Sequence, residues 1–476
     1  MISEILLAIC LLIMGVWWWI TKGHNYWAEK GVITPPIKLP FGNNPTLNND
    51  IILSRKNVCT IAKEQFELLD RPKCYGTYVL NQPILMVCDP EMVKQIFVKD
   101  FNNFIDRQSK NAKSLFNEET LTDKIWLEMM IFLDGEHWKD VRGTFSPIFT
   151  SGKMKGMFSL IQETSKLLNK SFEDELRNGN SAELELKDKF GRFSMDTIAS
   201  CAFGIDAKSF SKTGESDFVI NARNIFRRSI DDNIKLPIAI IPYLGPKLMK
   251  LFKIAVFKSK ETMFFYTVLK SAINQRVEGK VEKRNDLIDL MLEAIKETQT
   301  DEENSNITDN KEASLTEQIE EDSKLNHKRK KQIEEINLIA TALVMFVAGY
   351  DTTAQTLSFV GYELAKNPEI QDKLCEEIDA VVEQTGGELP SYNQIQGMQY
   401  LDMVIHEALR KWPIVGVITR GVERDCVIPG TNIDVKKNME IHVNVPAIHH
   451  NPENFPDPQV FDPERFNKEN SAKRHP

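Results

Sequence analysis

One short stretch in the second half of the chain carries side chains able to do acid–base chemistry. It reads Ala348-Gly349-Tyr350-Asp351-Thr352-Thr353 and lies within a long run of apolar residues. A glycine, an acid and two threonines all cost helix stability, so their presence in an apolar helix needs a reason. A threonine hydroxyl can donate to the carbonyl one turn earlier, and a glycine can let the helix open into a pocket for water. These residues alone leave two interpretations open: a water-containing site, or a helix-packing notch with a threonine bonded to its own helix.

A second pattern pairs opposite charges on a predicted helix, in Glu407-Ala408-Leu409-Arg410. Residues three apart share a helix face, so Glu407 and Arg410 can form an ion pair. Most such pairs are solvent-exposed and contribute little to stability, so this pattern is weak by itself. It is followed further along the chain by Pro463-Glu464-Arg465-Phe466.

A third pattern places an aromatic ring and a cation on one helix face, in Trp138-Lys139-Asp140-Val141-Arg142. Trp138 and Arg142 are four residues apart, which suits a clamp for a carboxylate. A cation–π pair at the surface is the simpler alternative.

The elements that would position these residues are mostly helices. Helical periodicity runs from about residue 111 to 296, and an apolar helix runs from near Ile333 to about Lys366, where Asn367-Pro368 ends it. Short alternating segments predict strands, with a hairpin turn between the first two of them and a helix start at Asp89-Pro90. The predicted strands are 75–80, 84–88, 414–419, 427–430 and 441–445. We therefore predict one mainly α domain with small β-sheets, residues 43–476.

The N-terminus predicts a membrane anchor at residues 1–22. Ile5 to Ile20 carries no charge and ends in three tryptophans, and a span needs roughly 17–25 apolar residues. A cleaved signal peptide is the alternative, but no basic residues precede the segment and no small-residue cleavage site follows it. Residues 23–42 form a proline-rich connector. The polar segment 297–331 predicts a solvated, mobile insert within the domain.

Composition narrows the function classes further. The net charge of −9 argues against a nucleic-acid partner, which would require a basic surface. The seven cysteines are scattered and form no Cys-x-x-Cys pair, which favours reduced thiols in a domain that faces the cytosol.

Taken in order, these motifs resemble those of cytochrome P450, the haem-thiolate monooxygenases, and most closely the microsomal enzymes of insects and vertebrates that oxidise foreign compounds. Residues 145–154 strengthen the resemblance. It implies a haem b cofactor, with Thr352 as the distal alcohol, Asp351 as the acid of a proton relay, and Ala348 and Gly349 as the groove above the iron. Protons delivered to a site closed to bulk water are what cleavage of dioxygen requires.

The resemblance also implies roles for the other motifs. Trp138, Arg142 and Arg420 would hold the haem propionates, with Arg107 a looser match. Three further residues would form a buried structural triad: Glu407, Arg410 and Arg465. The implied partners are an NADPH-dependent reductase, membrane lipid, dioxygen and a small lipophilic substrate, at the endoplasmic reticulum membrane with the globular domain facing the cytosol.

One part of the family pattern has no counterpart in these residues. The family continues past the position of Phe466 into a Phe-x-x-Gly-x-Arg-x-Cys loop whose thiolate binds the iron. Here no cysteine follows Cys426, so we expect no metal ligand within the chain, an axial thiolate beyond residue 476, and a fold incomplete at its C-terminus. Cys375 and Cys426 lack flanking glycines and predict small buried hydrophobes.

Two functions remain open on this basis. The first is a haem-dependent monooxygenase. In this case, we expect the chain as written to bind haem weakly or not at all. The second is an inactive, truncated relative that at most binds a ligand or partner at the membrane. The intact pair Asp351 and Thr352 favours the first.

Overall fold

The protein is described here from a computed structural model, which divides into two compact units. The described residues are 2–108, 113, 116–177, 183–211, 214–227, 244–297, 334–428 and 430–472. The first unit combines residues 1–113 with 399–476, and the second comprises residues 114–398.

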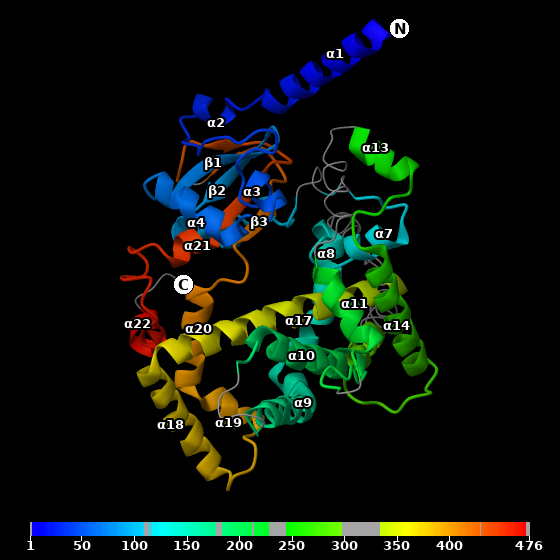
Figure 1. Cartoon of the computed structure of the whole chain (residues 1–476), viewed down its shortest axis with the longest axis vertical. Coiled ribbons are helices and arrows are strands. Elements are labelled where there is room, and N and C mark those ends of the chain that lie inside the picture. The colour runs from blue at the N-terminus through cyan, green and yellow to red at the C-terminus, as the bar shows by residue number, and fades with distance from the viewer. Residues whose placement is uncertain are drawn as a thin grey trace, which may run out of the picture. The chain divides into compact units, whose positions relative to one another are not determined.

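The first unit is built on a four-stranded sheet of order β1-β2-β6-β3 (Figure 1). β1 (Cys74–Val79) and β2 (Gln82–Val87) form an antiparallel hairpin. β2 then pairs in parallel with β6 (Glu440–Asn444), which pairs antiparallel with β3 (Val417–Gly421). The sheet therefore joins strands from opposite ends of the sequence.

The remaining elements of the first unit are short helices and a two-stranded ribbon. They are α1 (Ile2–Thr21), α2 (Tyr26–Glu29), α3 (Asn49–Ile52), α4 (Val58–Leu68), α5 (Pro90–Lys94), η1 (Gln95–Lys99), η2 (Phe101–Asn103), α20 (Gln399–Lys411), β4 (Cys426–Val427), β5 (Asp434–Val435), α21 (Val445–His449), η5 (Pro463–Phe466) and α22 (Lys468–Ala472).

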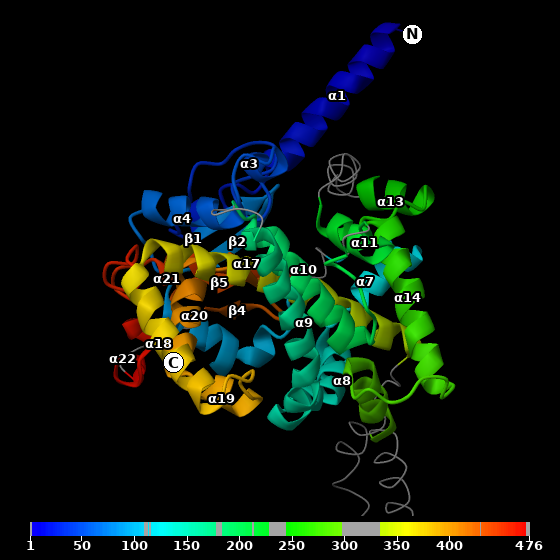
Figure 2. The ribbon, with the colours of Figure 1, turned by 60° about the horizontal axis from the view of Figure 1, so that its bottom comes forward.

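The second unit is helical and is organised around α17 (Glu335–Lys366). α10 (Leu186–Ile198) runs along it, as both ribbon views show (Figures 1 and 2). The two helices approach closely at Gly361, whose position faces Leu186, and at Gly349, whose position faces Ile198. This order of contacts makes the pair antiparallel.

The other elements of the second unit surround this helix pair and an aromatic core that includes Phe203, Phe265 and Phe346. They are α7 (Leu121–Leu127), α8 (Gly135–Phe145), η3 (Ser146–Phe149), α9 (Ser151–Arg177), η4 (Ala199–Phe203), α11 (Asp217–Phe226), α13 (Leu244–Leu251), α14 (Ser259–Val277), α18 (Pro368–Gln384) and α19 (Tyr392–Gly397).

The predicted fold class, mainly α with small sheets, is confirmed. α17 ends at Lys366, and the Asp89 side chain caps α5 by accepting from the amide of Met92. Of the predicted insert, residues 298–331 lie outside the described residues. The prediction that Cys375 is buried is wrong, because this thiol lies on the exposed side of α18.

The N-terminal anchor stays a prediction. Residues 2–21 form a single helix, α1. Among the described residues, the helix long and apolar enough to cross a bilayer is α17, and half of its most apolar window is buried inside the protein. Core helices of soluble domains pass the same test, so this finding does not assign a membrane span.

Candidate active site

The acid and the alcohol of the first motif lie on one turn of α17. Asp351 and Thr352 are partly exposed and Ala348 is exposed. The Thr352 hydroxyl donates to the Ala348 carbonyl, one turn earlier in the same helix. This hydroxyl therefore presents its oxygen lone pairs away from the helix, where they can accept a proton or a hydrogen bond.

Another residue of the same turn packs on α10. A Cβ at position 349 would lie 2.6 Å from Cδ1 of Ile198, so a larger residue there would require the end of the Ile198 side chain to move. Gly349 therefore contacts α10, and its predicted place in the groove with Ala348 stays a prediction. The turn combines both interpretations of the sequence motif: a glycine that packs against α10, and a threonine hydroxyl bonded to its own helix and partly exposed.

Asp351 has two polar partners. The Gln355 side-chain amide donates to Oδ2, and Lys187 Nζ of α10 lies 3.6 Å from Oδ1. The carboxylate remains 27% exposed, so solvent can reach it while these two donors orient it. Sequence analysis missed Lys187, because no local pattern connects α10 with a residue so far along the chain.

Two arginines lie side by side in the first unit. The Thr419 hydroxyl donates to the Arg107 carbonyl at 2.5 Å, which ties residue 107 to strand β3 beside Arg420. The Arg420 guanidinium stacks 4.2 Å from the centre of the Phe97 ring. Burial and, to a smaller extent, the positive charge of Arg107 lower the Arg420 pKa to about 10.

The Arg420 Nε is buried and has no hydrogen-bond partner among the described residues. A buried donor without a partner costs free energy, and two neighbouring cations repel each other. Both costs would be relieved by a carboxylate or phosphate placed against the pair. The donor set of Arg107 and Arg420 thus fits an anionic group.

Trp138 and Arg142 belong to α8 in the second unit. The Arg142 guanidinium lies 5.7 Å from the centre of the Trp138 ring, and Arg142 is exposed. This is the cation–π pair expected as the simpler alternative, and its geometry leaves the guanidinium edge open to an anion. The Trp138–Arg142 pair lies in the second unit, and Arg107 and Arg420 lie in the first.

The charges of the Glu407–Arg410 motif and of the later Pro463–Phe466 motif meet inside the first unit. Arg410 donates from Nε and Nη2 to the two carboxylate oxygens of Glu407, at 2.6 and 2.7 Å. Nε of Arg465 lies 3.5 Å from the same carboxylate. Glu407 is fully buried and Arg410 is 2% exposed, so this is not a surface pair.

Comparison with known proteins identifies the family. A family model described as Cytochrome P450 matches residues 54–476. The chain belongs to the cytochrome P450 family. It is 30% identical over 474 residues to Cytochrome P450 6k1 of Blattella germanica, covering 99% of this chain and 84% of that protein. It is 32% identical over 468 residues to Cytochrome P450 6B2 of Helicoverpa armigera, with 98% and 84% covered. Cytochrome P450 9c1 of Drosophila melanogaster is 32% identical over 456 residues, with 95% and 81% covered.

This P450 is accordingly a haem-dependent monooxygenase, and its cofactor is haem b with an axial thiolate. The arginines present fit the propionate groups of that cofactor. Haem b carries two propionate carboxylates, and the orphaned Nε of Arg420 beside a second arginine is the kind of donor that a buried carboxylate satisfies. Trp138 and Arg142 offer a second, exposed site of the same chemistry.

Proposed function

We propose that this P450 inserts one atom of dioxygen into a small lipophilic substrate, with electrons from NADPH delivered by a reductase, and that Asp351 and Thr352 deliver the protons. The observation that carries the proton-delivery role is the turn of α17, where a solvent-accessible carboxylate and a hydroxyl occupy adjacent residues. When bound, haem supplies the iron at which dioxygen is reduced. The protein supplies orientation and protons.

The proposed roles of the two side chains follow from their contacts. Asp351 takes up a proton from solvent, because it is partly exposed and held by Lys187 and Gln355. Thr352 accepts a hydrogen bond from the group that carries that proton and so orients it, because the hydrogen of its own hydroxyl is donated to the Ala348 carbonyl. Glu407, Arg410 and Arg465 brace the first unit, and the arginines at 107, 142 and 420 with Trp138 hold the propionates.

The proposed location is the endoplasmic reticulum membrane, with the globular part facing the cytosol. The apolar side chains of α1 support it, because Leu7, Met14 and Trp17 are each more than half exposed. At 1.5 Å per residue, the 20 residues of α1 span about 30 Å, the thickness of a hydrocarbon core. The apolar surface of α1 would then be covered by lipid.

A second candidate is a non-catalytic, membrane-tethered binder of ligands or partners. It retains the fold and the anion-binding arginines, and it predicts no oxidation of any substrate.

The test uses the haem-loaded protein with NADPH, a microsomal reductase and an ethoxycoumarin probe. We expect oxidised probe from the wild-type protein and about 100-fold less from Asp351→Asn or Thr352→Ala, a typical loss for a general acid or base. Thr353→Ala, which removes the exposed neighbouring hydroxyl, is the matched control and keeps its activity. Haem uptake without any oxidised probe in the wild-type protein would favour the non-catalytic candidate.

A further inference from the structure

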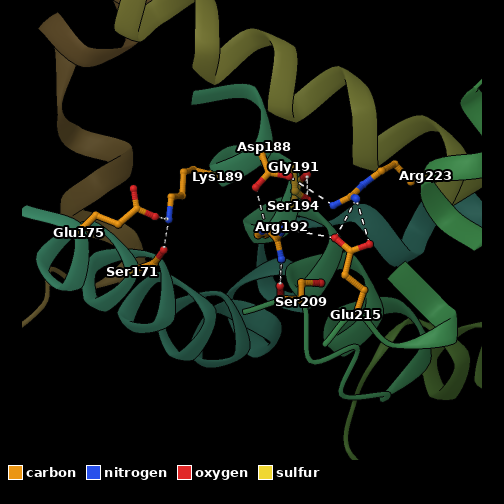
Figure 3. A network of polar contacts seen from close by, with 10 residues as sticks. All are labelled: Ser171, Glu175, Asp188, Lys189, Gly191, Arg192, Ser194, Ser209, Glu215 and Arg223. Atoms are coloured by element: carbon orange, nitrogen blue, oxygen red, sulfur yellow. Dashed lines mark hydrogen bonds and ion pairs between the residues drawn. The ribbon is translucent and has the colours of Figure 1, made fainter. Parts of the chain in front are cut away.

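Ser194 of α10 makes a contact with α17 that neither the sequence motifs nor the family assigns. Its hydroxyl lies 2.9 Å from the Tyr350 carbonyl and 3.1 Å from the Gly191 carbonyl of its own helix. The side chain is 2% exposed and faces α17 (Figure 3). Tyr350 immediately precedes Asp351, so this hydroxyl bonds to the peptide group that joins Tyr350 to the acid.

The turn that carries Asp351 and Thr352 is thus bound by hydroxyls at two of its carbonyls. Thr352 donates to the Ala348 carbonyl from within the helix, and Ser194 donates to the Tyr350 carbonyl from outside it. Positions two residues apart are rotated by about 200° around a helix of 3.6 residues per turn. The two hydroxyls therefore act on opposite sides of α17.

These two hydroxyls have different mechanical effects. A threonine bonded back to its own helix tends to bend that helix, because it competes with the regular amide donor. A serine from the neighbouring helix instead attaches the turn to a fixed partner. Ser194 is thus placed to limit how far the turn at Asp351 moves when the hydrogen bond of Thr352 changes.

The side chain of Tyr350 holds the same peptide in place. Its ring stacks on Phe346, with centroids 5.9 Å apart and planes 2° apart, and passes 3.8 Å from the position where Gly191 would carry a Cβ. Its hydroxyl is bonded to Arg223 of α11. Arg223 is in turn paired with Glu215 at 2.8 Å and Asp188 at 3.3 Å (Figure 3).

We propose that Ser194 is a positioning residue: its hydroxyl fixes the Tyr350 carbonyl and thereby the orientation of the acid and the alcohol that follow. The proposal rests on the proposed function, in which Asp351 and Thr352 deliver protons. Without the hydroxyl, the turn can adopt orientations from which protons arrive late. Dioxygen then takes up the electrons from NADPH and leaves as hydrogen peroxide, and the substrate is not oxidised.

Ser194→Ala is a mild substitution for this test. Alanine is smaller than serine, and the carbonyls of Gly191 and Tyr350 keep their helical amide donors, so no buried group is left without a partner. Ser358→Ala is the matched control. Its hydroxyl donates to the Ala354 carbonyl at 2.7 Å on the same helix, but within α17 only.

The first readout is hydrogen–deuterium exchange of the full chain, which needs no activity. We expect Ser194→Ala to speed exchange of the amides at 351–356 about fivefold, the effect of losing one hydrogen bond of ordinary strength. Exchange elsewhere in the chain should stay unchanged in Ser194→Ala. In Ser358→Ala, exchange should stay unchanged everywhere outside α17. Unchanged exchange at 351–356 in Ser194→Ala would overturn the proposal.

The second readout is the share of NADPH electrons recovered in oxidised ethoxycoumarin by the haem-loaded protein. We expect Ser194→Ala to lower this share, with a matching rise in hydrogen peroxide and an unchanged KM, while Ser358→Ala keeps the wild-type share. Faster exchange with an unchanged share would show that Ser194 only packs, and would overturn the positioning role. Absence of probe oxidation by the wild-type protein would instead refute the proposed function, which the exchange data do not test.

Discussion

Two buried charges of opposite sign, Glu407 and Arg410, occupy one turn of α20. Every nitrogen of the Arg410 guanidinium has an acceptor, since Nη1 donates to the His449 carbonyl at 2.9 Å and Nη2 also donates to the Pro458 carbonyl at 3.0 Å. Glu407 accepts in addition from the amide of Asp462 at 3.0 Å. A buried ion pair is tolerated only when its hydrogen bonds are complete in this way. The pair therefore joins α20 to two later segments of the chain.

Neutralising Glu407 should be costly. Glu407→Gln leaves the Arg410 charge buried without its counter-ion, and we expect a loss of about 3–5 kcal/mol in the free energy of unfolding. Urea denaturation followed by circular dichroism measures it. Asp425→Asn breaks the exposed pair with Lys436, whose atoms are 3.2 Å apart, and should change stability by less than about 1 kcal/mol. Equal effects of the two substitutions would contradict the structural role of Glu407.

Replacing Arg420 should weaken haem binding. Arg420→Leu removes the buried donor that has no partner within the described residues, and a hydrogen bond to a charged group contributes about 1.5–3 kcal/mol. We expect the Kd of the full chain for haem to rise about tenfold or more, measured by absorbance titration. Arg424→Leu removes an exposed arginine of the same unit and serves as the control. A Kd that changes equally in both variants would exclude a specific contact with a propionate.

At this scale, sequence reasoning found the contacts that are local. Glu407 and Arg410 are three residues apart, so helical periodicity alone brings them together. Lys187 and Ser194 could not be found, because their contacts with Asp351 and Tyr350 depend on how α10 packs along α17. The contact of Gly349 with Ile198 could not be found for the same reason: a glycine in a helix does not reveal which neighbouring side chain packs against it.

Among the elements, α2 is attached to the sheet through Trp27. Trp27 is fully buried, and its indole nitrogen donates to the Thr77 carbonyl of β1 at 3.1 Å. A Cβ at Gly76 would lie 2.2 Å from Cγ of the Trp27 ring. The strand can approach the ring this closely only because residue 76 has no side chain.

Filling that space should expel the ring. We expect Gly76→Ala to lower the free energy of unfolding by about 3 kcal/mol, the upper end for overpacking, because a rigid indole cannot move aside within its rotamer. Gly156→Ala is the control: it lies in α9 with no atom within 4 Å of the new Cβ, and should gain about 0.5–1 kcal/mol. Denaturant unfolding measures both variants. A neutral Gly76→Ala would show that α2 is not held on the sheet by Trp27.

Elements with local signals were predictable. The hairpin of β1 and β2, the capped start of α5 and the end of α17 all follow from turn residues and proline. The two-residue strand β5 was missed, because its backbone pairing with β4 has no alternation long enough to detect. The parallel pairing of β2 with β6 is equally invisible in sequence, since it joins residues near opposite ends of the chain.

On the scale of the whole molecule, the chain divides in a way that its sequence did not indicate. The first unit is discontinuous, because residues 399–476 return to the sheet begun by residues 74–87. Composition changes little at either crossing point, so no linker marks the boundaries. The prediction of a single domain over 43–476 therefore stays untested, and stability measurements should follow each unit with its own probe.

Acid should destabilise the first unit through two adjacent histidines. Burial lowers the pKa of His449 to about 4, and the charge of Arg410 acts in the same direction. Burial also lowers the pKa of His450 to about 4, with further contributions from Lys63 and Arg410. Both rings contact backbone carbonyls of α20, at 3.2 and 3.1 Å. The two histidines therefore link α21 to α20, the helix that carries the buried pair of Glu407 and Arg410.

The direction of the effect follows from proton binding. An unfolded histidine titrates near pH 6.5, so between pH 6.5 and 4 the unfolded chain binds more protons than the folded one. The stabilising contribution is thus fully present above pH 6.5 and is lost as the pH falls toward 4, by on the order of 2–3 kcal/mol for His449. Urea unfolding at pH 7 and pH 4.5 measures the slope. His449→Gln should flatten it, whereas His406→Gln, at an exposed position of α20, should leave it as in the wild type. A slope that His449→Gln does not change would mean that other groups, and not this buried ring, carry the acid sensitivity of the unit.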